Sequence, residues 1–284
     1  MSEFKQILYE RPEPAIARVW LNRPETRNAQ DTALLYELND AFDLAIADPE
    51  VKVIILAAKG PHFSSGHDMM EITENPQGEM PRRKRVGTWS SADWFEVEGY
   101  YAREKEIYEG FCKRWRDLSK PTIASVHGKS ISGALMLIWP MDIVIASEDA
   151  TFQDNTLSMG IPGIEYFAHA WELGIRKAKE FLLVGQPMTA PEAMRAGMVN
   201  RVVPRDRLEE ETLELARSIA DKPSFALSLG KEAINAAFSA QGFDNVQRAA
   251  FNAHHLAHTY YRYTQDGAFA DRAFLNRFAA TKKK

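Results

Sequence analysis

Residues 60–71, GPHFSSGHDMME, follow the apolar run VKVIILAA at residues 51–58, with Lys59 between the two stretches. A nearly continuous run of aliphatic residues is typical of a strand that is covered on both faces. The small polar residues around Gly66 predict a tight turn, with a helix beginning after it. Because the first N–H groups of a helix have no partner inside the helix, such a turn presents backbone donors that attract negative charge.

A second turn of the same kind, Ser130-Ile131-Ser132-Gly133, comes after a predicted strand at residues 120–126. Two backbone donors that face one point can hold a developing oxyanion, and one such donor stabilises a transition state by about 2.7–4 kcal/mol. Either turn alone is explained more simply by the small residues that any tight turn requires.

Predicted strands and helices alternate up to about residue 205, and the chain is mainly helical after it. Residues 32–47 predict an amphipathic helix, because Asp31 is a good N-cap and apolar residues recur at helical spacing after it. Residues 71–93 are rich in proline, glycine and charge, which predicts a long loop. Further strands are expected at 16–21, 142–146 and 199–203, and helices at 94–118, 177–184, 191–196, 208–220, 223–238 and 244–263.

The composition argues against several classes of protein. The chain has 284 residues, of which 45% are hydrophobic, and this suffices for a full core. A net charge of −4 does not provide the basic surface that a nucleic-acid-binding protein needs. Cys112 is the single cysteine, so a reducing compartment fits best, and no apolar run approaches the roughly 18 residues of a membrane span. We therefore expect a cytoplasmic protein that binds neither nucleic acid nor membranes.

Four segments, in this order, resemble the crotonase (enoyl-CoA hydratase/isomerase) superfamily: LNRPETRNA at 21–29, GPHFSSGHDM at 60–69, PTIASVHGKSISGALMLIWPMDIVIAS at 121–147 and FLLVGQPMTAPEAMRAGMVNRVV at 181–203. The resemblance extends from about Ile16 to Val203. It implies an α/β fold in which a spiral of ββα units, residues 1–205, is followed by a helical C-terminal trimerisation region, residues 206–284. It also implies a homotrimer or a dimer of trimers, and an acyl-CoA thioester as the ligand, with coenzyme A as part of the substrate and no separate cofactor.

The resemblance also assigns roles to residues of the two turns. The thioester oxygen would be held by the backbone amides of His67 and Gly133. Seven residues would lie beside the bound coenzyme A: Arg27, Asn28, Ser65, His67, Asp68, Met69 and Gly133. The implied activity is that of a lyase or isomerase of fatty acid metabolism.

Two positions depart from the family pattern. The general acid and base of family hydratases are two glutamates, which correspond here to Met136 and Thr156. Neither side chain can act as a carboxylate base, and a positioned acid or base contributes about 10²–10⁴-fold to a rate. The resemblance therefore supports the oxyanion site but not hydration by the usual mechanism.

Three nearby residues are candidates to replace the missing glutamates: Asp154, Glu165 and His67. Each also has a simpler interpretation, since Asp154 can cap a turn, Glu165 can cap a helix and the His67 imidazole can lie in solvent. The alternative function is a family member that binds acyl-CoA without catalysis, which Met136 and Thr156 favour. A role in RNA binding is disfavoured by the acidic balance.

Three further motifs have both a structural and a functional interpretation. His254 and His258 have the i, i+4 spacing of a helical zinc pair, but no third ligand is evident, so we expect an ordinary helix face and no metal. The basic run 82–85 is interpreted as a solvated loop, with contact to the phosphates of coenzyme A as the alternative. Asp271 stands where relatives place a phenylalanine near coenzyme A, and Phe269 or Phe274 are possible substitutes.

Overall fold

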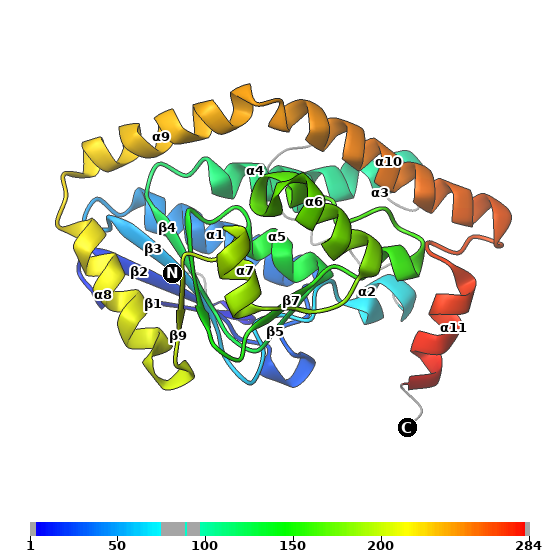
Figure 1. Ribbon diagram of the computed structural model, residues 1–284, viewed down its shortest axis with the longest axis horizontal. Helices are drawn as coiled ribbons and strands as arrows, with labels where there is room; N and C mark the ends of the chain where they lie inside the picture. The colour runs from blue at the N-terminus through cyan, green and yellow to red at the C-terminus, as the bar shows by residue number, and fades with distance from the viewer. Residues whose placement is uncertain (1–3, 75–88, 90–96, 282–284) are drawn as a thin grey trace.

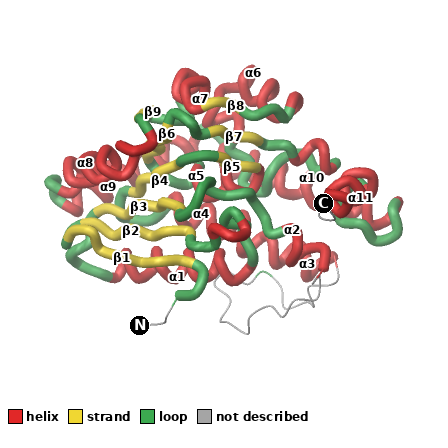
Figure 2. The backbone as a smooth tube through the Cα atoms, turned by 90° about the horizontal axis from the view of Figure 1, so that it is seen from below, coloured by secondary structure: helices red, strands yellow, loops and turns green. Residues whose placement is uncertain are grey.

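A six-stranded sheet in the order β1-β2-β3-β4-β6-β9 forms the centre of the computed structural model, which describes residues 4–74, 89 and 97–281. Only β1 and β2 are antiparallel, and every other neighbouring pair is parallel. Figure 2 shows these strands side by side, with the smaller sheet β5-β7-β8 next to them. The strands are β1 Ile7–Glu13, β2 Ile16–Leu21, β3 Val53–Ala58, β4 Thr122–Val126, β5 Lys129–Ile131, β6 Ile143–Ser147, β7 Thr151–Gln153, β8 Met188–Thr189 and β9 Arg201–Val203.

Helices cover both faces of the large sheet (Figure 1). They are α1 Thr32–Ala47, α2 Met69–Glu74, α3 Val97–Glu104, α4 Phe111–Arg116, α5 Leu135–Ile138, α6 His169–Val184, α7 Ala190–Ala196, α8 Leu208–Ala220, α9 Ser224–Ala240, α10 Phe243–Thr264 and α11 Arg272–Thr281. A π-helical turn, Lys105–Gly110, joins α3 to α4. In the described part of the chain, no helix is long and apolar enough to cross a membrane.

The two faces of the sheet explain the continuous apolar runs in its strands. Because successive side chains of a strand point to opposite faces, alternate residues of β3 pack in different clusters. Ile54 and Leu56 pack in the large core cluster with α1, whereas Val53 and Ile55 pack in a second cluster with α8. Helix α8 lies after residue 205 yet covers this sheet, so part of the C-terminal helical region belongs to the core.

Several elements differ from the sequence-based predictions. Helix α1 has the predicted bounds, with the Asp31 carboxylate accepting a hydrogen bond from Leu34 N. Strand β1 and helix α11 were not predicted, because β1 mixes charged and apolar residues and α11 has no buried residue. The predicted loop 71–93 overlaps α2, which begins at Met69. Most of that segment, including the basic run 82–85, lies outside the described residues.

Candidate active site

A cavity of about 310 Å³ opens where the two small-residue turns, the π-helical segment and the C-terminal helices meet. Its wall is mostly apolar, with a small number of convergent polar groups, as is typical of ligand sites. The polar residues that line it include Ser65, His67, Glu104, Ser132, Asn155, Glu165, His254 and His258.

The two turns are joined directly by backbone hydrogen bonds. Ser64 N donates to Lys129 O and Ile131 N donates to Ser64 O, both at 3.2 Å, which pairs Ser64 with Ser130. On its other side, the first turn pairs with Gln30 through Gly66 O and Asp68 N. In a parallel bridge of this kind the flanking groups form the bonds, so the N–H of the central residue, His67, points away from Gln30.

The amides of His67 and Gly133 border one small space. A β-carbon added to Gly133 would lie 3.1 Å from His67 N, and one added to Gly66 would lie 3.2 Å from Gly133 N. Gly133 is the second residue of a short 3-10 helix, Ser132–Ala134, where backbone N–H groups lack intrahelical partners. Ser132 adopts φ +46°, an unfavourable conformation for a non-glycine residue, and its Oγ donates to Asn155 Oδ1 at 2.7 Å.

The His67 imidazole lies in the wall of the cavity rather than in solvent. Its ring stacks on Tyr108, with ring centroids 4.1 Å apart and an interplanar angle of 24°. Its Nε2 lies 3.2 Å from Oε2 of Glu165, a residue that is only 3% exposed. Nδ1 of His67 is buried and has no hydrogen-bond partner among the described residues. The imidazole therefore has one nitrogen held by a carboxylate, whereas the other has no hydrogen-bond partner among the described residues.

Residues 11–272 match the model of the enoyl-CoA hydratase/isomerase family. The chain belongs to this family. It is 43% identical over 264 residues to "Putative enoyl-CoA hydratase EchA13" of Mycobacterium tuberculosis, an alignment that covers 91% of this chain and 82% of that protein. The predicted crotonase superfamily is therefore confirmed.

Solved structures of the family have the same fold. A crystal structure of a probable enoyl-CoA hydratase from Mycobacterium smegmatis superposes with a TM-score of 0.83 at 42% identity, covering 94% of this chain and 99% of that chain. An enoyl-CoA hydratase/isomerase from Xanthobacter autotrophicus Py2 superposes with a TM-score of 0.79 at 34% identity, covering 90% and 88% of the two chains. The predicted crotonase-like α/β fold with C-terminal helices is confirmed.

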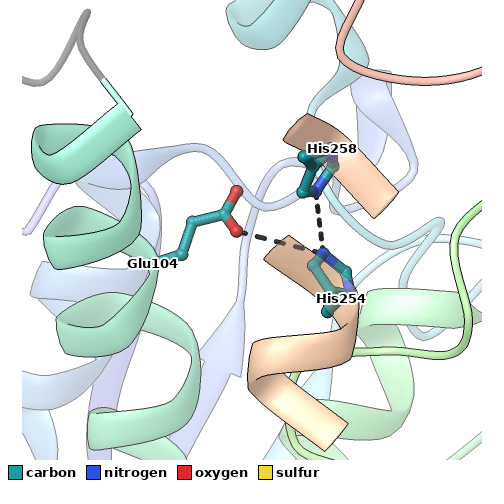
Figure 3. Close-up of side chains that lie close together, drawn as sticks. All are labelled: Glu104, His254 and His258. Atoms are coloured by element: carbon teal, nitrogen blue, oxygen red, sulfur yellow. Dashed lines mark hydrogen bonds and ion pairs between the residues drawn. The ribbon is translucent and has the colours of Figure 1, made fainter. Parts of the chain in front are cut away.

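The family member described here has a buried cluster of charged residues behind Glu165. Oε1 of Glu165 lies 3.3 Å from Nε2 of His254, on α10, so the two Glu165 oxygens contact two different histidines. Nε2 of His254 in turn lies 2.8 Å from Nε2 of His258. Glu104, at the end of α3, is 3.1 Å from His255. It is also 3.9 Å from His254 (Figure 3).

Opposite charges keep the carboxylates of this cluster ionised. Burial alone would raise the pKa of Glu165, but His67 and His254 outweigh burial and hold this pKa well below its usual range. Burial likewise opposes ionisation of Glu104, but His255 lowers the pKa of Glu104 to about 2. Burial would lower the pKa of His254, yet the Glu165 carboxylate raises it to about 9. Burial lowers the pKa of His258 to about 4.

Asp154, a second candidate carboxylate, is not among the residues that line the cavity. It is fully buried, and one of its oxygens lies 2.9 Å from Nε2 of His169. The carboxylate also accepts hydrogen bonds from N and Oγ1 of Thr156 and from Ile164 N. Since these partners use both oxygens, this placement favours a structural role for Asp154.

Met136 and Thr156 are the positions that the resemblance assigns to the two family glutamates, and neither brings a carboxylate to the cavity. Met136 is 1% exposed within α5 and is not among the cavity residues. Thr156 lines the cavity, but its hydroxyl donates to Asp154. Carboxylates reach the same cavity from Glu104 and Glu165 instead.

The residues that the family resemblance places beside coenzyme A fall into two groups. Ser65, His67, Met69 and Gly133 line the cavity. Asn28 is fully buried, and its side chain bonds Arg23 N, Lys59 O and His62 O, so it holds the turn in shape.

The other two residues of this set lie next to that turn. Arg27 is exposed, and its carbonyl accepts a hydrogen bond from Ser65 N. Asp68 is 3.2 Å from Arg23.

Aromatic residues of the C-terminal region also line this cavity. Phe269 and Phe274, the predicted substitutes for the family phenylalanine, are both in its wall, together with Phe278 of α11. Sequence reasoning missed Glu104 altogether and assigned His254 and His258 to an ordinary helix face. A buried glutamate has no distinctive local pattern, so only the i, i+4 histidine spacing pointed to this cluster.

Proposed function

We propose that this protein catalyses proton transfer next to the carbonyl of an acyl-CoA thioester, through an enolate held by the His67 and Gly133 amides. One observation carries the proposal: the two amides border the same cavity into which the His67–Glu165 pair projects. Stabilisation of a developing oxyanion by preorganised donors is usually the largest single contribution in such chemistry.

In this proposal the His67 imidazole carries the proton and Glu165 positions the imidazole. The Glu165 carboxylate stays ionised and accepts the Nε2–H of His67, which leaves Nδ1 as the basic nitrogen. Nδ1 takes a proton from a carbon that the thioester acidifies, and the amides stabilise the enolate oxygen. Return of the proton to a different carbon completes an isomerisation, whereas return to the same carbon gives exchange without net change.

The proposal also covers how coenzyme A binds, how the protein self-associates and where it is located. Coenzyme A would enter as part of the substrate along Ser65 and Met69, with Arg27 near the rim of the first turn. Self-association as a trimer or a dimer of trimers is supported by large exposed side chains on the C-terminal helices, such as Phe225, Ile234 and Leu256. A cytoplasmic location is supported by the single, buried Cys112.

The test is mass spectrometry of the protein incubated with a panel of acyl-CoA thioesters in deuterated water. The panel includes enoyl, 3-hydroxyacyl, malonyl-type and cyclic β-keto esters. Deuterium at the α- or γ-carbon is expected, and His67→Gln should abolish this exchange while acyl-CoA binding persists. Full exchange in His67→Gln would exclude the imidazole as the proton carrier.

A second candidate, an acyl-CoA-binding protein without catalysis, is favoured by the absence of a carboxylate at Met136 and Thr156. It predicts acyl-CoA binding by calorimetry with neither deuterium exchange nor product for any ester of the panel. Exchange with any one ester excludes it.

A further inference from the structure

Glu104, His254 and His258 meet at the inner wall of the cavity (Figure 3). The two histidines are one turn apart on α10 and point the same way, while Glu104 comes from the end of α3, just before the π-helical turn. The side chain of Glu104 is 2% exposed and that of His254 is 5% exposed. One potential ligand atom from each of the three residues lies within 4.8 Å of the other two.

The hydrogen bonds of the two histidines determine which nitrogens are protonated. Nδ1 of His254 lies 2.9 Å from Gly163 O, and Nδ1 of His258 contacts Phe269 O. A carbonyl oxygen can only accept, so each Nδ1 must carry a hydrogen. In the neutral rings, both Nε2 atoms then present lone pairs, and these atoms face each other at 2.8 Å. Two lone pairs at this distance repel each other unless a cation lies between them.

Glu104 adds a negatively charged ligand to this pair of nitrogens. Its Oε2 lies 3.9 Å from His254 Nε2 and 3.1 Å from His255 Nε2, so the buried carboxylate is already held beside the two α10 histidines of the cluster. Two imidazole nitrogens and one carboxylate form a ligand set that is typical of catalytic zinc sites. The Nδ1 contacts to backbone carbonyls match the arrangement that orients histidine ligands in metal sites.

We propose that Glu104, His254 and His258 form a binding site for a divalent transition-metal ion of the zinc type, with an open coordination position towards the cavity. Tetrahedral Zn–N bonds of about 2.0–2.1 Å place two histidine nitrogens about 3.3 Å apart, so the rings would separate by about half an ångström. All three ligands line the cavity, so a water molecule or a ligand oxygen there can complete the coordination.

A proton is the competing occupant of the space between the two Nε2 atoms. In that case Glu165, whose Oε1 is 3.3 Å from His254 Nε2, balances an imidazolium and no metal is required. The two possibilities differ in stoichiometric metal uptake. The proposed enolate chemistry does not depend on the metal, because it uses the other oxygen of Glu165 and the His67 ring.

The experiment uses the full-length chain without a histidine tag, treated with a chelator and dialysed. Titration with Zn²⁺ by calorimetry should give one equivalent bound, and Co²⁺ should give the intense visible bands of a four-coordinate site. His258→Gln and Glu104→Gln should each weaken Zn²⁺ binding at least tenfold. His62→Gln, which removes a histidine outside the cluster, should bind Zn²⁺ as the wild type does.

Circular dichroism of each variant identifies any that fail to fold, and the wild-type Co²⁺ spectrum tests the site without any substitution. A wild-type protein that takes up no Zn²⁺ and gives no Co²⁺ bands overturns the proposal in favour of the shared proton. Equal Zn²⁺ binding in wild type, His258→Gln and Glu104→Gln also overturns it. Deuterium exchange by the chelator-treated protein reports separately on the proposed function.

Discussion

Nε2 of His67 lies 3.2 Å from Oε2 of Glu165, although the two residues are 98 positions apart in the chain. This contact joins the first small-residue turn to the segment that follows Asp154. It places a buried, ionised carboxylate against the residue whose backbone amide borders the oxyanion space. One residue thus contributes a backbone donor and a side chain to the same cavity.

Replacing Glu165 should test its positioning role. In Glu165→Gln the amide cannot hold the His67 ring as a carboxylate does, and we expect kcat to fall by about 10²–10⁴-fold with little change in KM. Steady-state kinetics with the ester that shows exchange provide the measurement.

The matched control for this variant is Glu109→Gln. Glu109 is a buried carboxylate that pairs with Lys105 and Lys113 at 2.7 Å and is not among the cavity residues. The Glu109→Gln variant should have lower thermal stability than the wild type but the same kcat. Equal losses of kcat in the two variants would show that the effect comes from burial of a carboxylate rather than from contact with His67.

Removing the Gly133 amide should remove one oxyanion donor. Gly133→Pro lacks the N–H, and we expect kcat to fall by about 10²–10³-fold, since one donor is worth about 2.7–4 kcal/mol. The infrared carbonyl stretch of a bound thioester should shift to higher frequency in this variant, because the carbonyl is less polarised.

Gly133→Ala separates the lost donor from steric change. It keeps the N–H, but its β-carbon would lie 2.7 Å from Cε1 of His67, so the ring must move. We expect lower kcat with a carbonyl frequency closer to that of the wild type. If Gly133→Pro turns over at the wild-type rate, the oxyanion assignment fails.

Asp154→Asn should affect stability rather than chemistry. Burial alone would raise the pKa of Asp154, but His169 and Thr156 outweigh burial and hold it below its ordinary value of 3.8. The stability from this group is therefore present above pH 3.8 and is lost as the pH falls through the folded-state pKa. We expect the variant to lose about 1–3 kcal/mol of unfolding free energy at pH 7, because the buried His169 loses a charged partner.

Urea denaturation of both proteins from pH 7 to pH 3 measures this difference, which should shrink as the pH falls. Turnover per folded molecule should stay unchanged in Asp154→Asn. A large fall in kcat with unchanged stability would instead make Asp154 a member of the catalytic machinery.

Because of Glu172, in the first turn of α6, we expect the folded protein to lose stability as the pH rises. Burial raises its pKa to about 8, above the ordinary value of 4.5. The folded state therefore binds this proton more tightly than the unfolded chain, and stability falls as the pH rises towards and through 8. Glu172→Gln should melt at a higher temperature than wild type at pH 9 and at a similar temperature at pH 4.

Glu180→Gln, on the same helix, is the control because Glu180 is exposed and pairs only with Lys177 at 2.9 Å among the described residues. It should show the wild-type pH dependence. An identical fall in melting temperature from pH 6 to pH 9 in wild type and Glu172→Gln would contradict the assigned pKa shift.

Local spacing was sufficient to predict the elements that depend on neighbours in the chain. The helix Thr32–Ala47 follows from its Asp31 cap and apolar periodicity, and β3 follows from its aliphatic run. Strand β1 was missed because three of its seven residues, Glu10, Arg11 and Glu13, are charged, and among the described strands it pairs with β2 alone. Helix α11 was also missed, although Phe274, Leu275 and Phe278 recur at helical spacing along it and none of its residues is buried.

The sequence by itself determined the family, the α/β fold and the two turns, because glycine, small residues and hydrophobic periodicity act over a few neighbouring positions. Only the tertiary structure brought Glu165 and His67 together and placed Glu104 against His254 and His258. Such contacts depend on which faces of distant elements pack against each other, and this is decided by the whole core. The buried cluster is therefore visible in three dimensions and not in the order of the residues.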